Sequence, residues 1–138
     1  MNKPIVHNEL FLSRPSQPAT MADLVTVRDL LDTLAAHVDD CVGLAANMIG
    51  VQKRIIAFSD QERGCNRAML NPCIVECEGD YETTEGCLSL SGKRPATRYR
   101  RITVEYQDTA FKLHREDFEG YTAQIIQHEL DHCDGIII

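Results

Sequence analysis

The end of the chain carries the clearest chemistry, because His128-Glu129-Leu130-Asp131-His132 places two histidines four positions apart. On a helix, residues four apart lie on one face, about one turn from each other. Two imidazoles at that spacing can share a metal ion, and the glutamate between them can exchange a proton with water that the metal activates. The pattern therefore predicts a mononuclear metal hydrolase with Glu129 as its acid–base group. Five-residue patterns also arise by chance, and the alternative is a solvated helix with two surface histidines.

Two histidines do not complete such a site, because a catalytic metal usually takes three protein ligands and leaves one position open. Only six residues follow His132 in this sequence, so we expect the third ligand upstream. Thiolates are suitable ligands, and the candidates are Cys73, Cys77 and Cys87. Cys87 stands beside Gly86, and a glycine lets backbone approach a ligand closely. Spacing alone does not choose among the three cysteines.

Two helices are expected to frame the site. Residues 118–133 contain no proline and are followed by Asp134-Gly135, which predicts a helix that carries the histidines and ends at a glycine. Residues 21–39 have apolar side chains at helical spacing behind a start that resembles a capping box. They predict an amphipathic N-terminal helix that packs on the core.

Short strands are expected between the helices, at residues 54–59, 68–75, 102–106 and 111–114. Their apolar runs, alternation and intervening turn residues are typical of antiparallel hairpins. We therefore predict an α+β fold in which antiparallel hairpins pack around the C-terminal metal-binding helix. The length fits one domain over residues 1–138.

The composition narrows the class of protein. The formal net charge of −7 argues against general binding to nucleic acid or anionic membranes. One basic cluster is expected to be a solvated strand edge; its members are Lys93, Arg94, Arg98, Arg100 and Arg101. No apolar run reaches about 18 residues and no signal peptide is visible, so we expect a cytoplasmic protein without membrane contact. The six cysteines then indicate buried thiols and a metal ligand rather than disulfides.

Three segments match one family in order and spacing: GLAA at Gly43–Ala46, EGCLS at Glu85–Ser89 and QHELDH at Gln127–His132. LNP at Leu70–Pro72 also matches. From about Val6 to Ile136, the chain resembles the peptide deformylases. Three motifs together are far more specific than the histidine pattern alone.

The resemblance implies roles for individual residues. The metal ligands would be Cys87, His128 and His132, and the metal would be Fe²⁺ in the cell, with Zn²⁺, Ni²⁺ or Co²⁺ able to replace it. Glu129 would be the catalytic acid–base, and the backbone N–H of Leu88 would help to bind the oxyanion. Residues expected to contact substrate or orient the site are Gly43, Glu85, Gly86, Arg94 and Gln127.

The family reaction removes the formyl group from the N-terminal methionine of nascent polypeptides and releases formate. The implied partners are therefore N-formylmethionyl peptides. Transient contact with the ribosome is also implied, but this sequence lacks the C-terminal helical extension that can support docking in many family members.

One position departs from the family pattern. The first motif is usually Gly-x-Gly-x-Ala-Ala-x-Gln, and here Cys41 replaces the first glycine and Met48 replaces the glutamine. That glutamine donates to the oxyanion, whereas methionine has no N–H, and losing one such donor typically costs about 100- to 1000-fold in turnover. Asn47 could replace it only through a local backbone shift. The alternatives to an active deformylase are thus a deformylase-like enzyme with weak or altered N-acyl activity and a non-catalytic metal-binding module.

Overall fold

The computed structural model describes all 138 residues. Its helical elements are α1 (Glu9–Leu12), η1 (Met21–Asp23), α2 (Leu24–Ala36), η2 (Ala46–Ile49) and α3 (Gly120–Cys133). Its strands are β1 (Gly43–Ala45), β2 (Ile55–Asp60), β3 (Cys65–Gly86), β4 (Lys93–Gln107) and β5 (Leu113–Glu119).

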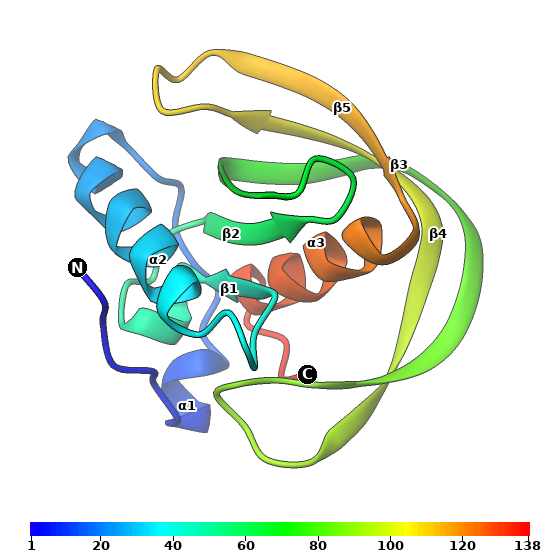
Figure 1. The fold of residues 1–138 in the computed structure, drawn as a ribbon, viewed down its shortest axis with the longest axis horizontal. Helices are drawn as coiled ribbons and strands as arrows, with labels where there is room; N and C mark the ends of the chain where they lie inside the picture. The colour runs from blue at the N-terminus through cyan, green and yellow to red at the C-terminus, as the bar shows by residue number, and fades with distance from the viewer.

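The strands form one antiparallel sheet in the order β1-β2-β3-β4-β5, so each strand pairs with its neighbours in sequence. The β3–β4 hairpin is much the longest and ends where Gly86 pairs with Lys93. Figure 1 shows this hairpin bending around α3, which lies near the centre of the molecule, with α2 at the other side of the view. The observed architecture confirms the predicted α+β class, with antiparallel strands around the C-terminal helix.

Helix α3 is buried on nearly all sides, since it packs against β1, β2, β4, β5 and η2. Ile126 and Leu130 join the hydrophobic core, and His128, Glu129 and His132 are buried as well. The alternative of a solvated helix with two surface histidines is therefore wrong. The helix is followed by Gly135 at φ +77°, where a Cβ atom would lie 2.5 Å from the Ser13 carbonyl oxygen.

The N-terminal helix differs in its limits from the expected 21–39. Its first turn is the 3₁₀ helix η1, and the Thr20 N–H donates to the Asp23 carboxylate at 2.8 Å, as the capping pattern predicts. The helix then stops at Ala36. A carboxylate is unfavourable at a helix C-terminus, so Asp39 and Asp40 lie beyond the last turn.

The strands are longer than the sequence indicates. Residues 68–75 are only part of β3, and the register of β3 against β4 shifts between Leu70 and Cys73. Asn71, in that shift, adopts a left-handed φ of 51°, which asparagine tolerates better than most residues. Its side chain accepts from the Ala19 N–H and donates to the Ala19 carbonyl, which holds the N-terminal loop on the sheet.

The prediction of a solvated strand edge for the basic cluster is confirmed only in part. β5 pairs with β4 from Arg101 onward, so residues 93–100 pair with β3 alone, and Lys93 and Arg100 are exposed there. Arg98 is only 4% exposed, and its side chain is directed toward α3. Arg101 is exposed but pairs with Glu78 and Asp117. None of the helices has the length and apolar character that crossing a bilayer requires.

Candidate metal centre and active site

Three potential metal donors converge at one point between the β3–β4 hairpin and α3. The His128 and His132 Nε2 atoms lie 3.1 Å apart, and Cys87 Sγ lies 3.3 Å from His132 Nε2. One ligand atom from each of the three residues lies within 4.8 Å of the others. The helix supplies both histidines from one face, and the segment that follows β3 supplies the thiol. Among the three cysteines that spacing left open, Cys73 and Cys77 are exposed on β3 and lie outside this group.

The donor set fits a divalent metal. Zinc–nitrogen and zinc–sulfur bonds of about 2.1 and 2.3 Å would separate tetrahedral ligand atoms by roughly 3.4–3.6 Å, close to the separations observed here. Two imidazoles and one thiolate suit zinc, iron, nickel and cobalt. Three such donors also leave one coordination position for substrate or water.

The two histidines of the donor group differ in their protonation. Burial lowers the pKa of His132 to about 3, and the neighbouring His128 adds to the effect, so the imidazole is neutral. Burial also opposes charge on His128, but contacts with Cys87, Glu129 and Glu85 raise its pKa to about 10. Because metal ligands must be deprotonated, metal uptake at this site would release protons.

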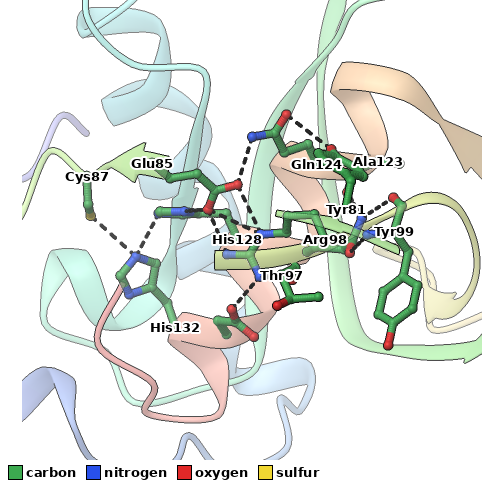
Figure 2. A network of polar contacts seen from close by, with 12 residues as sticks. Tyr81, Glu85, Cys87, Thr97, Arg98, Tyr99, Ala123, Gln124, His128 and His132 are labelled. Carbon is green, nitrogen blue, oxygen red and sulfur yellow. Dashed lines mark hydrogen bonds and ion pairs between the residues drawn. The ribbon is translucent and has the colours of Figure 1, made fainter. Parts of the chain in front are cut away.

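A buried arginine-centred network orients His128, and Figure 2 shows how its members converge. His128 Nδ1 lies 2.8 Å from Glu85 Oε1, and the same carboxylate accepts from Arg98 Nη2 at 2.7 Å and from Gln124 Nε2 at 2.8 Å. Arg98 Nη1 also donates to Asp131 at 2.7 Å. Burial opposes the charge on Glu85, yet these donors lower its pKa to about 2. The carboxylate therefore fixes the ring orientation of His128 and directs its Nε2 toward the other donors.

Glu129 lies beside the donor group in an apolar setting. It is 4% exposed, its Oε1 has no hydrogen-bond partner, and burial raises its pKa to about 7. A carboxyl group that titrates near neutral pH can both accept and donate a proton under working conditions. Buried, unsatisfied and pKa-shifted groups are concentrated at functional sites.

Gly43 creates the space that Glu129 occupies. A Cβ atom at this position would lie 2.7 Å from Glu129 Oε2 and 2.8 Å from Ile125 Cγ2. The absence of a side chain therefore lets β1 approach α3 closely. The close packing of β1 against Glu129 therefore accounts for a glycine at position 43.

A cavity of about 480 Å³ opens over this centre. Its walls come from residues 38–43, residues 84–88 and the exposed side of α3, and they include Glu129, His128 and Met48. Glu85 and Gly86 line it too, but the Glu85 carboxylate is already bound to His128, Arg98 and Gln124. The cavity is large enough for a short peptide end. Cys87 and His128 of the donor group line it, whereas His132 is not among its lining residues.

Few hydrogen-bond donors are available in the cavity for the predicted oxyanion. Leu88 lines the cavity, and its backbone N–H makes no hydrogen bond to the rest of the backbone. Met48 also lines the cavity, with its sulfur 3.4 Å from the Ala45 N–H. Asn47 does not line it, because its amide nitrogen donates to the His132 carbonyl at 2.9 Å. The idea that Asn47 replaces the missing glutamine is therefore wrong.

Two other expected residues lie outside the cavity. Gln127 accepts from the Tyr99 N–H at 2.8 Å and donates to the Tyr99 carbonyl at 2.8 Å, so its amide ties α3 to β4. Arg94 lies 3.8 Å from the Glu9 carboxylate of α1. A contact of Gln127 or Arg94 with the substrate remains a prediction.

The roles of Arg98, Asp131, Gln124 and Asn47 were not predicted from the sequence. Arg98 was expected among exposed cations, but successive residues of a strand point to opposite faces of the sheet, and Arg98 lies on the face that is turned toward α3. Asp131 and Gln124 lie three and four positions from His128 on α3, which is the helical spacing for neighbours. That spacing was the one available signal for them.

Two buried histidines and a half-buried cysteine converge beside Glu129, and Cys87, His128 and Glu129 line a peptide-sized cavity. This arrangement is typical of mononuclear metal-dependent hydrolases. Comparison with known proteins narrows the class. The model of the polypeptide deformylase family matches residues 3–138. A peptide deformylase of Clostridium beijerinckii is 52% identical over 138 residues, which is the full length of both chains.

Solved structures agree with the sequence comparison. Peptide deformylase from Thermotoga maritima superimposes with a TM-score of 0.86 at 30% identity, covering 99% of this chain and 94% of that one. The peptide deformylase from Thermus thermophilus gives a TM-score of 0.87 at 35% identity, covering 99% and 84%. The chain therefore belongs to the polypeptide deformylase family, and its activity is that of a peptide deformylase, a metal-dependent amidohydrolase.

Proposed function

We propose that residues 1–138 form a single catalytic domain that removes the formyl group from N-formylmethionyl peptides and releases formate. The observation that carries this proposal is the convergence of Cys87, His128 and His132 next to a cavity that Cys87, His128 and Glu129 line. A structural module would have no need of a buried carboxyl group whose pKa burial raises to about 7.

The residues would divide the reaction as follows. Cys87, His128 and His132 would hold a divalent metal, which when bound polarises a carbonyl and makes water more acidic. Glu129 takes a proton from water as the water oxygen bonds to the formyl carbon. It passes that proton to the amine as the C–N bond breaks, so the formamide yields formate and a free amino terminus. The Leu88 N–H donates to the developing oxyanion. The Glu85–Arg98 pair keeps His128 oriented throughout.

We propose Fe²⁺ as the metal in the cell, with Zn²⁺, Ni²⁺ and Co²⁺ as replacements. The thiolate of Cys87 favours these softer cations over Mg²⁺ or Ca²⁺. A thiolate and ferrous iron are both oxidisable, so the enzyme needs a reducing environment. This requirement, together with a substrate made on the ribosome, supports the cytoplasm as its place of action.

Met48 supports a second candidate, a deformylase with reduced turnover or altered N-acyl preference. Its side chain lines the cavity at the position where the family has a glutamine, and it offers no N–H to an oxyanion. Only the Leu88 N–H and the metal would then stabilise the charge. An oxyanion donor is worth about 100- to 1000-fold in turnover.

The test is formate release from formyl-Met-Ala-Ser by protein purified anaerobically with Fe²⁺, or with Ni²⁺ as a more robust metal. The Glu129→Ala and Met48→Gln variants are assayed beside it. Turnover that disappears in Glu129→Ala supports the proposal, and a large gain in Met48→Gln supports the second candidate. If neither the metal-loaded protein nor Met48→Gln releases formate, the proposed substrate is wrong.

A further inference from the structure

The two histidines at the centre differ in what holds their outer nitrogens. His128 Nδ1 contacts the Glu85 carboxylate at 2.8 Å, whereas His132 Nδ1 is buried and has no hydrogen-bond partner. A histidine that binds metal through Nε2 carries its proton on Nδ1, and that N–H almost always donates to an acceptor nearby. His132 is fully buried, so bulk water cannot serve as the acceptor.

Asn47 presents the complementary unsatisfied atom. It lies in η2, is fully buried, and its Nδ2 donates to the His132 backbone carbonyl at 2.9 Å. Because a carbonyl can only accept, this contact fixes which end of the amide faces His132 and leaves Oδ1 as an acceptor. Asn47 Oδ1 has no partner either. A buried donor and a buried acceptor are thus unpaired on two residues that already share one hydrogen bond.

We infer that Asn47 is the positioning residue for His132, as Glu85 is for His128. Its Nδ2 holds the carbonyl of His132, and its Oδ1 accepts from His132 Nδ1–H, either after a small rotation of the ring or through one bridging water. The paired contacts would fix both the last turn of α3 and the direction of His132 Nε2. This inference rests on the proposed role of His132 as a metal ligand.

The expected effect is on metal retention, because loss of such an outer partner typically weakens metal affinity by about 10- to 100-fold. Asn47→Leu removes both the donor and the acceptor of the amide. Asn47→Asp removes the donor but keeps an oxygen at the acceptor position. Thr33→Val is the matched control, since Thr33 is also fully buried but makes its hydrogen bonds to Asp29 and Lys3.

The experiment measures Co²⁺ affinity by chelator competition, the visible absorption of bound Co²⁺, and thermal unfolding of the metal-free proteins. We expect all three variants, Asn47→Leu, Asn47→Asp and Thr33→Val, to lower thermal stability. Only Asn47→Leu should lose Co²⁺ affinity by about 10-fold or more, with Asn47→Asp closer to the unsubstituted protein and Thr33→Val unchanged.

Unchanged Co²⁺ affinity in Asn47→Leu would overturn the inference, and so would an equal loss in Asn47→Asp, because the amide would then act only through the carbonyl. If the unsubstituted protein itself fails to bind Co²⁺, the proposed metal site is wrong, and the inference falls with it.

Discussion

One buried arginine and one partly buried arginine build networks of nearly the same chemistry in different parts of the sheet. Arg98 on β4 pairs with Glu85 and Asp131, each at 2.7 Å. Arg67 on β3 pairs with Asp60 at 3.0 Å and with Glu116 at 2.8 Å. Each arginine is planar, permanently charged and able to bind two carboxylates, which suits it to a buried position.

The two networks differ in the elements that they connect. Arg67 joins β2, β3, β4 and β5 through its two carboxylates and Tyr106, and its guanidinium lies 5.6 Å from the rings of Phe58 and Phe118. It therefore ties neighbouring strands to one another. The Arg98 network instead crosses from the sheet to α3 and ends on His128 Nδ1. The same ion-pair chemistry should therefore stabilise the sheet in one place and orient a metal donor in the other.

Replacing the arginines should give the largest effects and should separate the two roles. Arg98→Met leaves Glu85 and Asp131 without their cation, and breaking a buried pair in this way costs about 3–5 kcal/mol of unfolding free energy. Arg67→Met should cost less, because the Arg67 side chain is 15% exposed and the Arg98 side chain only 5%. Denaturant unfolding measures the unfolding free energy of both variants. Metal affinity should fall only in Arg98→Met.

The reverse result would break the comparison. If Arg67→Met released the metal as readily as Arg98→Met, the effect on the site would come from general loss of structure rather than from the contact between Glu85 and His128.

A smaller and more specific effect is expected from the carboxylates. Glu85→Gln keeps the shape of the side chain but removes the charge that faces His128, so metal affinity should fall by about 10- to 100-fold. Glu116→Gln is the matched change in the Arg67 network and should leave metal affinity as it is. Competition with a chromogenic chelator measures the metal affinity of both variants. Equal affinities in the two variants would contradict an orienting role for Glu85.

Removal of a single hydroxyl group, that of Tyr106, should have a smaller effect on the stability of the Arg67 network. The Tyr106 hydroxyl donates to Glu116 at 2.8 Å and accepts from Arg67 at 2.9 Å. Tyr106→Phe removes both contacts and should lower the unfolding free energy by about 1 kcal/mol. Formate release at saturating substrate should be unaltered. A change in turnover would mean that the Arg67 network also influences the site.

The smallest expected effect is on the pH dependence of stability. Hydrogen bonding from Arg67 lowers the pKa of Glu116 below its ordinary 4.5. Such a group binds more protons in the unfolded state, so its stabilising contribution is complete above pH 4.5 and is lost as the pH falls through the lowered pKa. Unfolding followed between about pH 5 and about pH 3 should therefore be less steeply pH-dependent in Glu116→Gln than in the unsubstituted protein. An identical slope would show that the pair is screened by solvent.

Local spacing accounts for what the sequence could predict. The placement of His128 and His132 on one face follows from helical periodicity, and the end of α3 follows from Gly135. Hairpins were predictable from alternation, because each strand pairs with its neighbour in sequence. The limits of β3 and β4 were not predictable, since their extra residues are held by pairing along a long ladder rather than by their own propensities.

The sequence by itself therefore determined the residue types of the centre, the helix that carries two of them, and the departure at Met48. Only the tertiary structure decided between Cys73, Cys77 and Cys87 on geometric grounds, because the side chains meet across 41 or more positions of chain. It also turned Arg98 inward and Asn47 toward His132. Those outcomes depend on which faces of the sheet and of η2 are covered by α3, and burial of that kind is a property of packing, not of local sequence.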